Sequence, residues 1–217
     1  MKKTLILVGA GKGLGNAIAK EFAAHDFRVV LIARNEESLQ SYKKEFMEQG
    51  YEVYTKSADA LYPETLTKAI NEAREELGVP DALVYNVGVT EPDGDREITN
   101  ELLMQRYQVD AASAYHCASL VATDEFAEKK GAIIFTGGGF AATFQPISFL
   151  KPLCIDKAAL NAMNIILHHE LEPKGIFVGS IMVCDVIAPG DVKYDPERIA
   201  KEYWKMYTER KEYEVAY

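Results

Sequence analysis

The sequence is poor in cysteine, in positive charge and in long apolar runs. Its three cysteines, Cys117, Cys154 and Cys184, are widely spaced and form no metal-ligand pattern, which indicates free thiols in a reducing compartment and predicts no metal site. The net charge of −9 argues against nucleic acid or an anionic membrane as a partner. No apolar run is long enough to cross a bilayer, so we expect a cytoplasmic protein.

The length and the apolar content of the sequence are those of a folded globular domain. The 217 residues, of which 48% are apolar, are enough for a single domain with a full core over 1–217. The start, Met-Lys-Lys before a short apolar run, is similar to a signal peptide. However, the run breaks into glycines and Lys12, so a first strand is the better interpretation.

Strand-like and helix-like segments alternate along the chain. After the first strand we expect strands at 28–33, 51–56, 82–85, 132–135 and 176–183, and helices at 35–49, 63–77, 101–129 and 155–171. This alternation predicts an α/β fold, a doubly wound parallel sheet with helices on both faces. The Rossmann-type, three-layer α/β/α sheet has six strands, or seven if 212–217 forms one more.

Residues 190–217 are expected to form a helical tail packed on this domain. Asp195-Pro196-Glu197 has the N-cap, first-turn proline and early acid of a helix start. The aromatic cluster Tyr203, Trp204 and Tyr207 then either packs on the domain or forms a lid over a substrate pocket.

Residues 4–15 combine the first apolar run with glycines at 9, 11, 13 and 15, and an amphipathic segment follows at once. In the order strand, glycine turn, helix, the unpaired N–H groups of the helix start lie where a phosphate can bind. Glycine also lets a ligand approach without meeting a Cβ. The spacing is G-x-x-x-G-x-G, on Gly9, Gly13 and Gly15, and no Gly-Lys-Ser/Thr closes a Walker loop. The motif predicts a nucleotide-phosphate cradle.

This turn resembles that of the short-chain dehydrogenase/reductase family. Asn86-Val87-Gly88 is similar to the end of the family's Asn-Ala-Gly motif, and Lys157 begins a Lys-Ala-Ala-Leu sequence like that of the helix whose lysine holds the nicotinamide ribose. The resemblance covers about residues 3–188. It implies cofactor binding by Gly9, Lys12, Gly13, Leu14, Gly15, Arg34, Asp59 (near the adenine), Asn86, Gly88, Lys157 and the backbone of Val186.

Two basic residues favour NADP(H) over NAD(H). An NAD-binding turn carries a carboxylate about 20 residues after the glycines, where it accepts hydrogen bonds from the ribose. Ala33 stands at that position and Arg34 follows it. A guanidinium binds a 2′-phosphate through paired charge-assisted hydrogen bonds. Lys12, inside the glycine turn, is the second positive charge that NADP-preferring members of the family carry there.

The residues that the family uses for proton transfer are missing. Its tyrosine, four residues before the lysine, is replaced by Leu153, and its serine aligns with Gly138. The family's asparagine aligns with Asp110, so only Lys157 remains of four catalytic positions. The chain resembles an atypical branch that also lacks the tyrosine. We take Lys157 and Asp110 as the catalytic candidates, and Asp110 acts as acid or base only if burial raises its pKa; otherwise it bonds backbone.

Substitutes for the missing hydroxyls are available but have structural interpretations too. Thr136 or Ser148 could polarise a carbonyl, His116 could pack or form an interface, and the late tyrosines reach the cofactor only if the tail is a lid (Tyr194, Tyr203, Tyr207 and Tyr213).

Three functions are therefore open. The first is an NADP(H)-dependent oxidoreductase with an atypical acid or an unusually reactive small-molecule substrate. The second is an NADP(H)-binding protein with little or no catalysis, in a sensory or structural role. The third is a cofactor-assisted isomerase that uses Asp110. The family resemblance also implies a homodimer or homotetramer formed through the helices expected at 101–129 and 155–171.

Overall fold

A computed structural model describes residues 2–142 and 145–217, and these residues form one parallel sheet of seven strands in the order β3-β2-β1-β4-β5-β6-β7. The strand order reverses between β1 and β4, and ligands of such sheets bind at this point, outside the carboxyl ends of the strands. The predicted doubly wound sheet is confirmed, with the seventh strand. The strands are β1 (Lys3–Val8), β2 (Phe27–Ala33), β3 (Val53–Ser57), β4 (Ala82–Tyr85), β5 (Ala132–Gly138), β6 (Phe177–Val183) and β7 (Glu214–Ala216).

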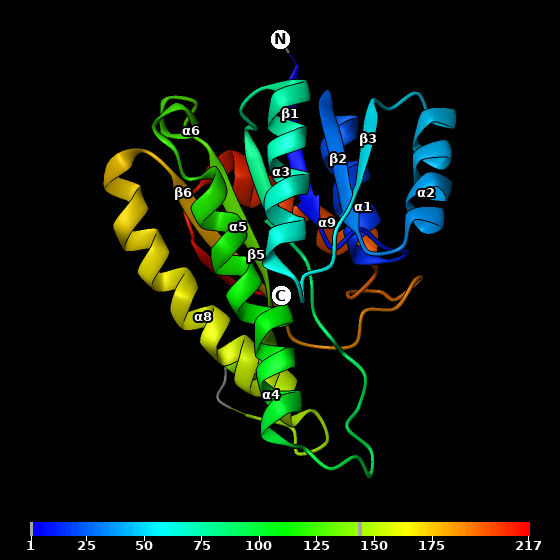
Figure 1. Cartoon of the computed structure of the whole chain (residues 1–217), viewed down its shortest axis with the longest axis vertical. Helices are drawn as coiled ribbons and strands as arrows, with labels where there is room; N and C mark the ends of the chain where they lie inside the picture. Colours follow the sequence, from blue (N-terminus) through cyan, green and yellow to red (C-terminus); the bar gives the residue numbers. More distant parts are fainter. Residues whose placement is uncertain (1, 143–144) are drawn as a thin grey trace.

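Helices cover both faces of the sheet (Figure 1). On one face α1, α2 and α9 share a hydrophobic core with Leu5 and Leu7 of β1, and on the other α3, α5 and α8 share a core with Ile6 and Val8. Successive residues of β1 are therefore buried on opposite faces, which is why the central strands are continuous apolar runs. The helices are α1 (Leu14–Ala24), α2 (Glu36–Glu48), α3 (Pro63–Leu77), α4 (Asn100–Tyr107), α5 (Ser113–Val121), α6 (Asp124–Glu128), α7 (Gly139–Ala142), α8 (Lys151–Leu171) and α9 (Pro196–Glu209).

Helix starts follow the predicted capping residues. The Asn35 side chain accepts a hydrogen bond from the Ser38 N–H at 2.7 Å at the start of α2. The Asp195 side chain accepts one from the Glu197 N–H at 2.8 Å at the start of α9. Each cap satisfies an amide that has no partner within its helix.

The prediction of a single helix over 101–129 is wrong. It is divided into α4, a π-helical turn at Gln108–Ala112, α5 and α6. The break before α6 has a local cause, because the Thr123 side chain accepts a hydrogen bond from the Phe126 N–H and starts a new helix. The expected start of α8 at 155 is also wrong. The helix begins at Lys151 with Pro152 in its first turn, where a missing N–H costs nothing.

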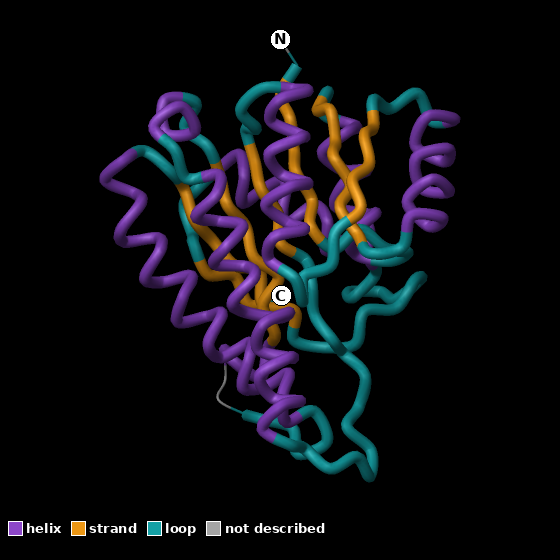
Figure 2. The backbone as a smooth tube through the Cα atoms, viewed as in Figure 1, coloured by secondary structure: helices purple, strands orange, loops and turns teal. Residues whose placement is uncertain are grey.

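The segment 190–217 contains α9 and ends in β7. Strand β7 joins the sheet beside β6, and the Tyr213 carbonyl accepts hydrogen bonds from the Ser180 N–H and the Asn164 side chain. Tyr203 and Tyr207 of α9 are buried in the core, which supports packing over a lid. Loops gather at the carboxyl ends of the strands, the lower edge of the sheet in Figure 2. Among the described helices, none has the length and apolarity to span a membrane.

Candidate functional site

The glycine turn joins β1 to α1 at the switch point of the sheet. Gly9 and Gly13 have φ angles of 96° and 121°, a region that L side chains rarely adopt. A Cβ on Gly15 would lie 2.4 Å from the Gly9 carbonyl oxygen, so the turn is closed on itself. The Asn16 side chain accepts the Gly11 N–H at 3.1 Å, and Leu14, the first residue of α1, is buried. The turn therefore needs glycine at each of the three motif positions.

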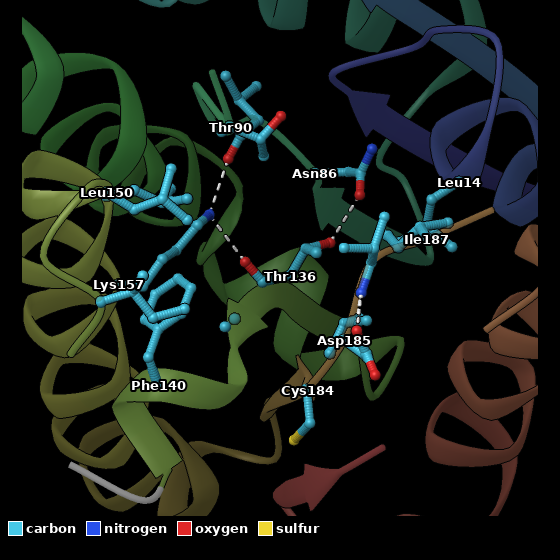
Figure 3. Close-up of a pocket in the computed structure, with 18 residues that line it drawn as sticks. Leu14, Asn86, Thr90, Thr136, Phe140, Leu150, Lys157, Cys184, Asp185 and Ile187 are labelled. Carbon is cyan, nitrogen blue, oxygen red and sulfur yellow. Dashed lines mark hydrogen bonds between the residues drawn. The ribbon is translucent and has the colours of Figure 1, made fainter. Parts of the chain in front are cut away.

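Asn86, directly after β4, packs against this turn. Its side-chain Nδ2 donates to the Gly9 carbonyl at 3.1 Å, and its Oδ1 accepts from the Thr136 hydroxyl at 2.9 Å (Figure 3). A Cβ on Gly88 would lie 3.3 Å from the Lys157 Nζ atom, so the backbone after β4 also runs close to the lysine. The structure thus brings the glycine turn, Asn86, Gly88 and Lys157 together.

Lys157 is buried and its ammonium group is held by backbone oxygens. The Nζ atom donates to the carbonyls of Val87 and Thr136, both at 2.9 Å (Figure 3). Burial lowers the pKa of Lys157, and the nearby carboxyls of Asp110 and Asp156 oppose that shift. The lysine therefore joins the segment after β4 to the carboxyl end of β5 while it faces the site.

Asp110 lies in the π-helical turn and is fully buried. Its carboxylate accepts the Val89 N–H at 3.0 Å. Burial raises its pKa, against the opposing charges of Lys157 and Arg106 and the hydrogen bond from Val89. Because the carboxylate bonds backbone, the structural interpretation of Asp110 has direct support, and it does not line the cavity described below.

The charged cofactor candidates lie at neighbouring strand ends. Lys12 and Arg34 are both exposed. Lys12 follows β1 and Arg34 follows β2, and these two strands are neighbours in the sheet. Asp59 follows β3, and its carboxylate accepts the Leu61 N–H at 2.9 Å, so it stabilises the turn before α3.

A cavity of about 500 Å³ opens at the carboxyl ends of the strands beside this group. Val186, 77% exposed, stands at it with its N–H donated to Asp185 at 2.7 Å, and the Cys184 sulfur is exposed (Figure 3). Half of the 18 lining residues have large apolar side chains, namely Leu14, Val87, Phe140, Ile147, Leu150, Leu153, Val183, Val186 and Ile187. The others are Asn86, Gly88, Thr90, Thr136, Gly137, Gly138, Lys157, Cys184 and Asp185.

Comparison with known proteins decides the family. The sequence pattern of the short chain dehydrogenases matches residues 3–197. This chain belongs to the short chain dehydrogenase family. It is 32% identical over 181 residues to the inactive hydroxysteroid dehydrogenase-like protein 1 of Homo sapiens, covering 82% of this chain and 54% of that protein. It is 28% identical over 208 residues to the (S)-acetoin-forming diacetyl reductase of Staphylococcus epidermidis, covering 95% of this chain and 78% of that protein.

The chain spans about half the length of the hydroxysteroid dehydrogenase-like relatives that it matches. A short chain oxidoreductase of Pseudomonas aeruginosa, solved with NADPH bound and containing an atypical catalytic centre, shares the fold with a TM-score of 0.88. The two are 16% identical, and the match covers 99% of this chain and 94% of the other. At this identity the likeness concerns the fold.

Leu153 and Gly138, which the sequence resemblance aligns with the tyrosine and the serine of the family, both line the cavity. Leu153 lies one helical turn before Lys157 on α8, is buried, and lines the cavity. Gly138 lies beside Phe140, and a Cβ at Gly138 would fall 2.6 Å from the Phe140 ring. An apolar side chain and an aromatic ring therefore occupy the two places where hydroxyls would stand.

The other candidate hydroxyls have structural partners or lie elsewhere. Thr136 bonds Asn86 and Tyr203. Ser148 is exposed and does not line the cavity, and His116 hydrogen-bonds Thr67 between α5 and α3. Tyr194 and Tyr213 contact other rings, Tyr217 and His168 respectively, and Tyr207 bonds Lys3. Within the described residues, no cluster could hold a metal ion.

Two buried charges beside Lys157 were not found from the sequence as site residues. Asp156 is 1% exposed, and its Oδ2 atom has no hydrogen-bond partner among the described residues. Burial, with a smaller contribution from the nearby Asp110 carboxyl, raises the pKa of Asp156 to about 7, while the charges of Arg106 and Lys157 oppose the shift. Arg106 donates to the Val89 carbonyl. From the sequence, an aspartate next to a lysine on a helix is expected to be exposed to solvent. Asp156 is buried because α4 and the π-helical turn pack on α8.

Proposed function

We propose that the protein binds NADP(H) along the carboxyl edge of β1, β2 and β4. The observation that carries this proposal is the glycine turn of Gly9, Gly13 and Gly15, packed on Asn86 at the switch point and beside Lys157. The ends of β1 and β2 thus supply a phosphate cradle and two basic side chains, and helix α8 adds a buried ammonium beside the segment that follows β4.

Each residue has a defined part in this proposal. The turn and the start of α1, with Leu14, hold the pyrophosphate, and Lys12 and Arg34 hold the 2′-phosphate. Asp59 borders the adenine, and Gly88, Lys157 and the backbone of Val186 border the nicotinamide half. Lys157 keeps one N–H free after its two carbonyl bonds, because an ammonium has three donors. That donor is available to a ribose hydroxyl.

We propose further that the substrate is a small apolar acceptor whose reduction needs no positioned acid. Bound NADPH supplies a hydride, which carries two electrons. A ketone oxygen becomes an alkoxide as it receives a hydride and needs a proton in the same step, which Leu153 cannot give. A quinone accepts the hydride as a delocalised hydroquinone anion and takes its proton from water afterwards. The apolar cavity suits such a planar, uncharged molecule.

Titration of the protein with NADPH and NADH, followed by nicotinamide fluorescence or calorimetry, tests the binding. Tighter binding of NADPH is expected, and equal affinities would remove the NADP(H) assignment. Oxidation of NADPH is then compared with 1,4-naphthoquinone and with 1-tetralone, which share a bicyclic skeleton. We expect turnover with the quinone and little with the ketone. Equal rates with both would show that the site contains its own acid.

A second function is favoured by the same substitutions. If NADPH binds and neither acceptor oxidises it, the protein uses the cofactor as a structural or sensory ligand. The human relative is named as inactive, which supports a role without catalysis. The test above separates the two, since binding and turnover are measured independently.

We also propose a homodimer or homotetramer through α4, α5 and α8. These helices carry exposed apolar side chains at Met104, Tyr115, Ile155 and Ile166. Light scattering of the wild type and of Ile155→Glu checks this, because a charge at the centre of such an interface is expected to dissociate it. A wild-type monomer contradicts it.

A further inference from the structure

A chain of hydrogen bonds crosses the carboxyl edge of the sheet from α9 to the glycine turn. The Tyr203 hydroxyl lies 2.7 Å from the Thr136 hydroxyl, which lies 2.9 Å from the Asn86 Oδ1 atom. The Asn86 Nδ2 atom then donates to the Gly9 carbonyl at 3.1 Å. The chain links β5, β4 and β1, which are neighbours in the sheet, and the Asn86 and Thr136 part of it is visible in Figure 3.

The chain can run in only one direction. The Gly9 carbonyl only accepts, so the amide nitrogen of Asn86 must face it and its oxygen must face Thr136. Thr136 has a single hydroxyl proton and gives it to that oxygen. The Tyr203 hydroxyl must therefore be the donor to Thr136.

Asn86 lies against two of the three motif glycines. A Cβ on Gly9 would fall 2.7 Å from the Asn86 carbonyl, and a Cβ on Gly15 would fall 3.1 Å from its Nδ2 atom. The backbone and the side chain of Asn86 are therefore both packed against the glycine turn. The Thr136 carbonyl also accepts the Lys157 ammonium at 2.9 Å, so the same residue touches both halves of the proposed cofactor site.

Tyr203 is suited to hold this chain in place. Its side chain is 0% exposed and packs in the core between α9 and the sheet. Burial raises the pKa of its hydroxyl well above the ordinary value, so the proton stays on the oxygen throughout the physiological range. Tyr203 lies beyond residue 197, where the match to the family ends.

We propose that Tyr203 is a positioning residue for the cofactor, whose hydroxyl fixes Thr136 and through it the Asn86 amide against the glycine turn. This inference rests on the proposed binding of NADP(H). Without the Tyr203 proton the Thr136 hydroxyl is free to rotate, and the Asn86 oxygen loses the donor that holds the amide in its productive orientation. The C-terminal helix thereby contributes to a site that it does not line.

The experiment compares two matched variants of the full chain, Tyr203→Phe and Tyr207→Phe. Both tyrosines are buried on α9, but the Tyr207 hydroxyl bonds the Lys3 ammonium at 3.1 Å, away from the chain of hydrogen bonds. We expect Tyr203→Phe to raise the Kd for NADPH about threefold to tenfold, the range for one net hydrogen bond. Tyr207→Phe is expected to stay within about twofold of the wild type. Denaturant unfolding verifies that both variants are folded in the binding assay.

Substitutions at Thr136 separate positioning from general loosening. Thr136→Ser keeps the hydroxyl and should bind NADPH more tightly than Thr136→Val, which has the same shape as threonine without it. Because the effect of Tyr203 passes through Thr136, the double variant Thr136→Val with Tyr203→Phe should bind no more weakly than Thr136→Val alone. Fully additive effects, or a Tyr203→Phe that binds like Tyr207→Phe, overturn the inference while leaving the proposed function. A wild type that does not bind NADPH overturns both.

Discussion

Placing a phenol at position 153 should raise the ketone reductase activity of the protein. Leu153 lies one turn before Lys157 on the same side of α8, and both line the cavity. In Leu153→Tyr the new hydroxyl would stand near a buried ammonium, which lowers the pKa of a phenol from its usual value of about 10. The variant would then contain a proton donor next to the proposed nicotinamide position.

The size of the effect follows from what a positioned acid contributes. General acid catalysis contributes about 10²–10⁴ in rate, equivalent to about 2.7–5.4 kcal/mol of activation free energy. We expect a gain of about tenfold to 100-fold for Leu153→Tyr, since the helix was not selected to aim this hydroxyl. The assay is NADPH oxidation with 1-tetralone or an activated diketone. Quinone reduction should not improve, because it needs no acid.

The matched control is Leu153→Phe, which adds the same ring without the hydroxyl. If the phenylalanine variant gains as much as the tyrosine variant, the ring and not the acid is responsible. A wild type as fast as Leu153→Tyr would refute our reasoning altogether, since the site would already hold its acid.

Restoring the serine is harder, and the structure shows why. In Gly138→Ser the added Cβ would meet the Phe140 ring at 2.6 Å, so the ring must move. We expect Gly138→Ser to add to Leu153→Tyr only when Phe140→Ala is present to make room. An additive effect with Phe140 intact would show that the ring yields freely.

Three further outcomes are expected. Arg34→Ala should weaken NADPH binding about 10- to 150-fold, the loss of one charge-assisted contact, and leave NADH binding unchanged in the same titration. Gly13→Val should abolish NADPH binding in a chain still folded by circular dichroism, because φ of 121° strains any residue with a Cβ; normal binding would place the cradle elsewhere. Asp156→Asn should raise the unfolding free energy by about 1–2 kcal/mol near pH 8, and the gain should vanish toward pH 4. The Asp156 pKa of about 7 means that the folded state holds a proton that the unfolded state has lost, so wild-type stability falls as pH rises toward 7; a gain independent of pH would contradict this origin.

The fold was accessible from the sequence because its signals are local. The apolar strand runs, the Asn35 and Asp195 caps and the glycine turn each act within a few residues, and the structure places them as expected. The prediction of one long helix over 101–129 was wrong because the structure there depends on contacts between residues far apart in the sequence. The π-helical turn of Gln108–Ala112 places the Asp110 carboxylate on the Val89 N–H, a contact between residues 21 apart that no helical periodicity reveals.

The residues of the site likewise fall into those that local motifs predict and those that depend on tertiary packing. Sequence analysis could find the glycines, Asn86 and Lys157, because each belongs to a short motif of the family. Asp156, Arg106 and Tyr203 depend on which helices lie against one another, and their chemistry appears only when α4, α8 and α9 are in place.

The contacts of Lys157 explain how a site can lack the tyrosine and serine and still contain the lysine. In a complete short chain dehydrogenase site the resemblance gives the lysine two roles, to hold the nicotinamide ribose and to lower the pKa of the tyrosine. Here its ammonium bonds the Val87 and Thr136 carbonyls, and so holds the segment after β4 to the carboxyl end of β5 without any phenol. The replacement of the tyrosine by Leu153 removes a proton donor. Removing the Lys157 charge would instead leave two carbonyls without their donor and Asp110 with Arg106 as its remaining nearby cation. These contacts give the lysine a structural role whether or not the protein reduces a ketone, so its presence is not by itself evidence of turnover.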